Sequence, residues 1–167
     1  GFTLLELCIA IAIMMILAAM EIPGVNRART AANEGAAIGS LRTINESQYA
    51  FVASCGSGFY APSLTVLGTP LLFGIPEGFI ATDLANDPST KSDYTLTLTP
   101  GAVAPAAPAS CNGVAAGSLV WSYYVGADPI PGGGIRFFGM NQGGTIYTAP
   151  AQLPVTQSGQ PAGSTAI

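Results

Sequence analysis

The sequence contains no histidine, and only 8% of its 167 residues are charged. Histidine is the commonest general base and metal ligand at neutral pH, so its absence removes the usual centre of a hydrolytic or metal site. The chain also lacks a Cys-x-x-Cys pair, a haem-attachment motif and a paired-carboxylate motif. Without a nucleophile beside a base, we expect a protein that is not an enzyme and has no cofactor and no metal site.

Positive charge is also scarce. Five Lys and Arg residues stand against nine Asp and Glu residues, which gives a net charge of -4. Nucleic-acid binding requires a basic stripe that neutralises phosphates, and none is present, so we expect no nucleic-acid partner. So few charges are unusual for a freely diffusing monomer, because repulsion between like charges keeps proteins apart. We therefore expect neighbouring subunits to cover part of the surface.

Three cysteines are distributed unevenly. Cys8 lies in the apolar start of the chain, while Cys55 and Cys111 lie in the more polar remainder. An oxidising compartment permits a disulfide between Cys55 and Cys111. The alternative is three free thiols.

Residues 1–20 form an apolar run that a single glutamate, Glu6, interrupts. As a helix this run is about 30 Å long, the thickness of one hydrocarbon core. An ionisable side chain in such a helix is costly, and it marks a functional position unless it has a partner. The alternative is a glutamate near the helix end that reaches the membrane interface.

The flanks of this run do not match a signal peptide, because no basic leader and no small-residue cleavage site are visible. Arg27 and Arg29 follow the run and nothing basic precedes it, contrary to the positive-inside rule. One explanation is that a short basic leader upstream of Gly1 has been removed.

Residues 1–7, Gly-Phe-Thr-Leu-Leu-Glu-Leu, resemble the processing site of type IV pilins and type II secretion pseudopilins, which reads G-F-T-L-I-E-L. The family's helix-breaking proline follows its glutamate by 17 residues, and Pro23 follows Glu6 by the same interval. The resemblance implies that a prepilin peptidase cuts between Gly1 and Phe2 and that the new N-terminal residue is methylated. Because Gly1 is present, either it is the last residue of the leader or cleavage falls one residue earlier.

The same resemblance, which covers about the first 50 residues, implies a partner for Glu6. In the family this carboxylate neutralises the N-terminal amine of the adjacent subunit during assembly, and two charges that are costly alone attract strongly when paired. The implied partners are identical subunits in a helical filament, the inner membrane before assembly, the prepilin peptidase and the pilus assembly machinery.

The sequence predicts an α+β fold with a long N-terminal helix. Residues 1–24 form its hydrophobic part, and residues 25–54 form its amphipathic part. Pro23 and Gly24 predict a kink or a locally melted stretch between them, the alternative being an ordinary end of the membrane helix.

A connecting loop over residues 55–93 is expected to follow the helix. It contains a cluster of oxygen-bearing side chains, which we interpret as a solvated turn rather than a calcium loop; its members are Asp83, Asn86, Asp87, Ser89 and Asp93.

The head is expected over residues 94–149 as a meander of about four antiparallel strands. Alternating and aromatic or β-branched patterns place these strands at 94–99, 118–125, 135–138 and 145–148. Residues 150–167 carry no charge and no periodicity, so they are expected to be a flexible tail or an extended strap on a neighbouring subunit.

These features together predict a major pilin in an extracellular filament, with an inner-membrane pool, that serves adhesion, motility or attachment. The alternative is a pseudopilin of a type II secretion system, which forms a short periplasmic filament and shares the N-terminal motif. A membrane-anchored binding module is disfavoured, because a plain anchor gains nothing from the carboxylate of Glu6.

Overall fold

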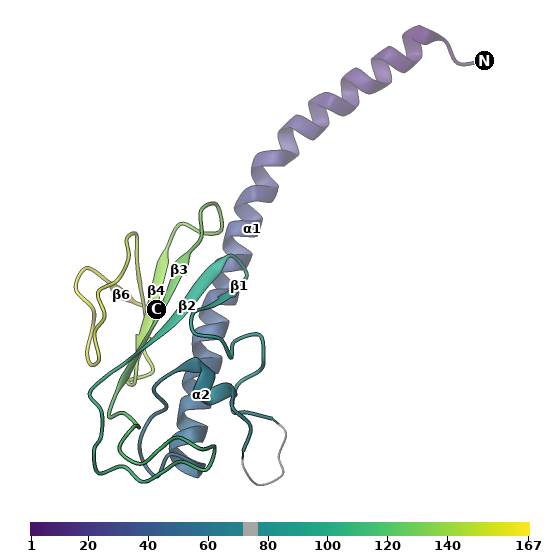
Figure 1. The fold of residues 1–167 in the computed structure, drawn as a ribbon. Helices are drawn as coiled ribbons and strands as arrows, with labels where there is room; N and C mark the ends of the chain where they lie inside the picture. The colour runs from purple at the N-terminus through teal and green to yellow at the C-terminus, as the bar shows by residue number, and fades with distance from the viewer. Residues whose placement is uncertain (72–76) are drawn as a thin grey trace.

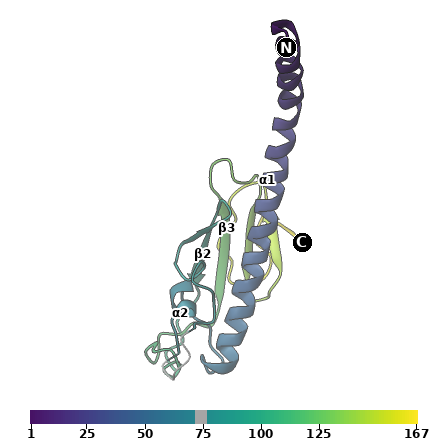
Figure 2. The ribbon, with the colours of Figure 1, turned by 90° about the vertical axis from the view of Figure 1, so that its right-hand side faces the viewer.

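The computed structural model describes residues 1–71 and 77–167, without the side chains of residues 20–23. One long helix, α1 (Leu4–Ser54), carries at its C-terminal half a head that contains a short helix, α2 (Leu64–Gly68), and an antiparallel sheet. The N-terminal half of α1 projects away from the head in both views (Figures 1 and 2). The α+β class predicted from the sequence is confirmed.

The two halves of α1 differ in burial. From residue 34 onward the helix has a buried face with spacings of three and four residues, which is the period of an amphipathic helix. This face packs against the sheet. It supplies the hydrophobic core with Ala37, Leu41, Ile44 and Phe51, and it also carries two buried polar side chains, Glu34 and Gln48. In contrast, every side chain from Gly1 to Ala19 is exposed.

The helical backbone of α1 runs without interruption through Pro23 and Gly24. Its axis curves between the projecting half and the half that bears the head (Figure 1). The side chain of Pro23 lies outside the described residues, so a kink centred on Pro23 and Gly24 stays a prediction.

The sheet has six strands in the order β1-β2-β3-β4-β5-β6, each antiparallel to its neighbour. Consecutive strands are therefore adjacent throughout, as in a meander. The strands are β1 (Ser89–Lys91), β2 (Tyr94–Pro100), β3 (Tyr123–Pro129), β4 (Phe137–Asn141), β5 (Ile146–Ala149) and β6 (Thr165–Ala166). Strands β2 to β5 correspond to the four strands predicted from the sequence.

Strand β2 shows why the sheet has one apolar face. Its residues alternate between the buried core and the outer face, as the pleat requires. The register pairs Leu96 with Ala127 and Leu98 with Val125, and all four side chains are buried. Together with Phe138 of β4, they face the buried side of α1 in one core.

The second predicted strand, at 118–125, was placed too early. Strand β3 starts at Tyr123, and residues 118–122 form a loop in which Val120 makes isolated bridges to Tyr60 and Val103. Val120 and Tyr60 exchange two backbone hydrogen bonds, of 2.9 and 3.1 Å. Aromatic and β-branched composition favours extended backbone but does not specify its partner, so the sequence could not separate this bridge from the sheet.

The predicted connecting loop and tail both contain regular structure. The segment at 55–93 includes α2 and β1, while the tail at 150–167 supplies β6 and folds over the outer face of its own sheet. There Leu153 is buried in a second cluster with Tyr124, Tyr147 and Ala149. The tail thus packs on its own head, and it is neither a flexible tail nor a strap that extends away from the head. Strands of two and three residues are too short to show a period of two, which is why the sequence missed them.

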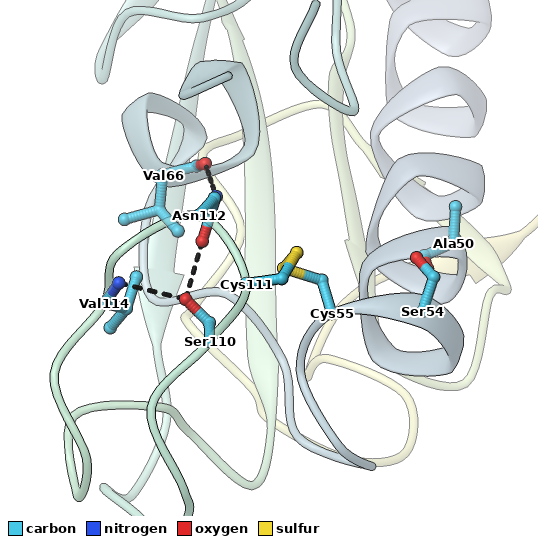
Figure 3. Close-up of a disulfide and its surroundings, with 8 residues drawn as sticks. All are labelled: Ala50, Ser54, Cys55, Val66, Ser110, Cys111, Asn112 and Val114. Atoms are coloured by element: carbon cyan, nitrogen blue, oxygen red, sulfur yellow. Dashed lines mark hydrogen bonds between the residues drawn. A yellow bond between two sulfur atoms is a disulfide. The ribbon is translucent and has the colours of Figure 1, made fainter. Parts of the chain in front are cut away.

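A disulfide between Cys55 and Cys111 closes the end of α1 onto the loop before β3 (Figure 3). The two Cα atoms are 4.9 Å apart, and the bridge joins residues 56 positions apart. Beside it, the Asn112 side chain donates a hydrogen bond of 2.7 Å to the backbone carbonyl of Val66 and accepts one of 2.6 Å from the Ser110 hydroxyl. The predicted pairing is confirmed.

Candidate functional site

The candidate functional site is the projecting half of α1. The most apolar 18-residue window of this helix has a mean hydropathy of 2.3, and none of it is buried in the chain. By length and composition the helix is able to cross a membrane. Leu4 is 82% exposed and Phe2 is 94% exposed, so the chain itself provides no cover for this segment.

Glu6 has a local structural role that the sequence analysis did not consider. Thr3 is the N-cap of α1, and its hydroxyl accepts a hydrogen bond of 3.2 Å from the backbone N–H of Glu6. In return, Oε2 of Glu6 accepts hydrogen bonds from the backbone N–H and the hydroxyl of Thr3, at 2.9 and 2.8 Å. This reciprocal pair is a capping box, which satisfies backbone donors at the start of a helix. Its signal, a threonine three residues before a glutamate, was visible in the sequence.

The capping box does not neutralise the charge of Glu6. The ion pairs within residues 1–71 and 77–167 join Lys91 to Asp83 and Arg136 to Glu34, and neither includes Glu6. Gly1, Phe2 and Glu6 together line an open hollow at the tip of the molecule. The structure therefore brings the predicted processing and assembly residues to one place. Cys8 lies just beyond, as an exposed free thiol.

A second carboxylate on α1, Glu34, has a complete set of partners within the chain. Its Oε2 accepts hydrogen bonds from Nε and Nη2 of Arg136, at 2.9 and 2.5 Å. Its Oε1 accepts hydrogen bonds from the backbone N–H groups of Ile135 and Arg136, both at 3.3 Å. Glu34 thus ties the loop between β3 and β4 to the helix.

The pKa of Glu34 reflects two opposing effects. Burial alone would raise the pKa of this carboxyl, because low polarity disfavours the charged form. The hydrogen bonds and charge of Arg136, with the N–H of Ile135, outweigh burial and hold the pKa below its ordinary value. The carboxylate is therefore ionised at neutral pH, where it stabilises the attachment of the head.

The sequence alone did not single out Glu34 or Arg136 as a pair. A signal for Glu34 was present, because it lies three residues before Ala37 on the buried face of the helix. A charge in the register of a core position requires a buried partner. The identity of that partner, about a hundred positions later in the chain, was not visible from the sequence.

Uncharged side chains also fix the head to α1. Gln48 is fully buried, and its amide exchanges two hydrogen bonds of 2.9 Å with the backbone of Ala61. The Tyr123 hydroxyl donates a hydrogen bond of 2.7 Å to the side chain of Asn45. These contacts, with the disulfide, attach the head at several heights along the helix.

The cluster of oxygen-bearing residues between Asp83 and Asp93 is occupied by protein partners. Asp83 forms an ion pair of 2.6 Å with Lys91. Asp87 accepts backbone hydrogen bonds from Leu64 and Leu98, at 3.0 and 3.1 Å. Across the described residues there is no group of three or more His, Cys, Asp or Glu that could hold a metal ion.

Comparisons of this chain with protein-family models, with curated proteins and with solved structures find no match.

Proposed function

We propose that this chain is the structural subunit, the major pilin, of an extracellular filament that resembles a type IV pilus and serves adhesion, motility or attachment. The observation that carries the proposal is the projecting half of α1. Residues 4–19 of this half are apolar on all sides, are not covered by their own chain, and carry one carboxylate, that of Glu6.

The energetics of this segment favour a covering by lipid or by other helices. Burial of apolar surface stabilises by roughly 25 cal/mol per Å², and a helix that is apolar all round is a buried or membrane-spanning element. Identical helices would cover one another in the core of a filament. Before assembly the same helix would sit in the inner membrane, where the prepilin peptidase and the assembly machinery would act on it.

The charge of Glu6 favours the filament over a simple anchor. An unpaired carboxylate in an apolar interior is strongly disfavoured, whereas a pair of opposite charges is tolerated. Within its own chain Glu6 has only the polar contacts of Thr3. The N-terminal amine of a neighbouring copy would supply the opposite charge at the open hollow that Glu6 shares with Gly1 and Phe2.

The second candidate function is a pseudopilin of a type II secretion system, which would use the same helix in a short periplasmic filament. The N-terminal motif and the projecting helix fit both functions. The low charge of the chain and its glycine-rich loops favour the exposed filament.

Electron microscopy of filaments sheared from cells that make this protein at native level tests the proposal. Long, thin filaments whose subunit has the mass of this chain are the expected result, and the mass also shows whether Gly1 is retained and whether the N-terminus is methylated. A subunit found only in the inner membrane, with no surface filaments, would contradict the pilus and favour the pseudopilin.

A further inference from the structure

A groove lies where the projecting half of α1 meets the head. The loop between β3 and β4 forms the end of the head nearest the projecting helix (Figure 1). This loop supplies Ile135 and Arg136 to one wall, and α1 supplies Arg27, Thr30 and Ala31 to the other. The groove has a volume of about 360 Å³ and opens to the surface.

The groove has an apolar rim. Ile135 is 74% exposed, although it follows Gly134 in a loop that is fastened to the helix by Glu34. Ile135 thus presents an apolar side chain at the edge of the groove, beside the projecting helix.

Cations lie at the groove and at the same level of α1. Arg27 lines the groove, whereas Arg29 lies outside it on another face of the helix. Both are exposed, and neither takes part in an ion pair within the described residues. Arg136 is paired with Glu34, and its side chain is still 51% exposed. Among the described residues, two carboxylates lie at this end of the head: Glu34, and Asp93, which accepts a hydrogen bond of 3.0 Å from the Asn33 side chain. Because Arg136 is already neutralised by Glu34, the positive field outside the groove comes mainly from the two unpaired arginines.

The height of these arginines along α1 matches a lipid headgroup layer. A helix that begins at Leu4 has crossed about 30 Å, one hydrocarbon core, when it reaches residue 23. Arg27 and Arg29 follow at a rise of 1.5 Å per residue, and so lie about 6 to 9 Å further out. The headgroup region on each side of a bilayer is roughly 5 to 8 Å thick. Arg27 therefore lies within the headgroup layer, and Arg29 lies at its outer edge.

We propose that the junction formed by Arg27, Arg29, Arg136 and Ile135 docks the head onto the anionic phospholipid headgroups of the bilayer that α1 spans. The inference rests on the membrane stage of the proposed function. The arginines contact phosphate oxygens, and Ile135 enters the apolar edge of the headgroup layer. The head is then held in one orientation on the membrane until the subunit is extracted.

The test uses the full chain in vesicles of phosphatidylcholine alone or of phosphatidylcholine and phosphatidylglycerol in equal parts. A spin label is attached at Ala31→Cys, on the groove wall, with Cys8→Ser removing the free thiol. Phosphatidylglycerol is expected to lower the access of a water-soluble relaxation agent to this label. A control label at Val103→Cys, on an exposed loop before β3, is expected to show no lipid dependence.

Variants that remove a charge identify the residues that dock the head onto the anionic headgroups. One arginine near an anionic surface changes the ratio of docked to undocked heads by about fivefold, so Arg27→Gln with Arg29→Gln is expected to lower it by about 25-fold. Arg42→Gln is the matched control. It removes an exposed arginine of the same helix that lies about 20 Å beyond Arg29, and it is expected to leave the ratio unchanged.

Two results would overturn the docking. One is equal access of the relaxation agent to the label at Ala31→Cys in the two kinds of vesicle, and the other is an effect of Arg42→Gln as large as that of the double arginine variant. Neither result would contradict the inserted helix or the filament proposal. A chain that is retained by neither vesicle would overturn both the docking and the membrane stage. If the double arginine variant docks normally but yields no filaments, the groove is a contact between subunits and the lipid assignment is wrong.

Discussion

The two halves of α1 belong to one continuous helix but depend on different surroundings. Leu17, in the projecting half, is 58% exposed, whereas Leu41, in the half that bears the head, is fully buried. The difference does not come from the residue type. It comes from the pattern of neighbours, which is apolar all round in the first half and one-sided in the second. The second half is covered by its own chain. For the first half, the proposed function supplies the cover in the form of a bilayer or of other subunits.

The two carboxylates of the helix show the same contrast. Glu34 accepts four hydrogen bonds from its own chain, two of them from the guanidinium of Arg136. Glu6 receives only the contacts of the N-cap residue Thr3. The chain completes the site of Glu34 and leaves the charge of Glu6 open. Under the proposed function, the N-terminal amine of a neighbouring copy would complete the site of Glu6.

The sharpest way to break this comparison is Glu6→Ala. It is expected to reduce filament yield by at least about tenfold, because the charge of the neighbouring amine would lose its partner, and to leave unfolding of the head unchanged. Yield is measured by shearing and electron microscopy. Thr3→Val removes the capping hydroxyl but keeps the carboxylate, so it is the control. If Thr3→Val abolishes filaments as fully as Glu6→Ala, the role of Glu6 is the capping of the helix.

Removal of the disulfide is expected to affect only the head. Cys55→Ser with Cys111→Ser should lower the free energy of unfolding by about 4 kcal/mol, the loop-closure value for a bridge of this span. Denaturant unfolding followed by the fluorescence of Trp121 measures the change. Cys8→Ser, which removes an exposed thiol of the projecting half, should leave the midpoint of denaturant unfolding unchanged. A shift with Cys8→Ser would show that the two halves are coupled.

The same truncation at two leucines sharpens the comparison further. Leu41→Ala is expected to cost about 3 kcal/mol of head stability, because it opens a cavity in the core. Leu17→Ala removes the same atoms from an exposed position and is expected to leave unfolding of the head unchanged. Both values come from denaturant titration of the monomeric chain in detergent. Similar losses for both variants would mean that the projecting half also packs on the head.

The smallest expected effect is at the polar contact between α1 and the loop that joins β3 to β4. Glu34→Gln should destabilise the head by about 2 kcal/mol, because Arg136 would lose its charged partner. Since the folded pKa of Glu34 lies below its ordinary value, its stabilisation is present at neutral pH and is lost as the pH falls through the folded pKa. The free energy of unfolding, measured from neutral to acidic pH, should therefore fall less steeply for the variant than for the unmodified protein. Equal slopes for the two proteins would contradict the role of Glu34.

Several features could be derived from the sequence because their causes are local. The uniform apolarity of residues 1–20 identified a membrane-length helix, and the period of two in β2 identified a half-buried strand. The capping pair of Thr3 and Glu6 is equally local. The disulfide was also predictable, since only Cys55 and Cys111 lie outside the apolar run.

Other features depended on contacts between distant segments, and only the tertiary structure decided them. Arg136 pairs with Glu34 because the loop between β3 and β4 returns to the helix about a hundred residues later. The tail closes over its own sheet because Leu153 finds an apolar cluster on the outer face. Strands β1 and β6 are specified by the strand beside each of them, not by their own two or three residues. Local pattern determines which elements form, whereas the pairing of buried charges, the strand edges and the path of the tail depend on which surfaces meet in the folded chain.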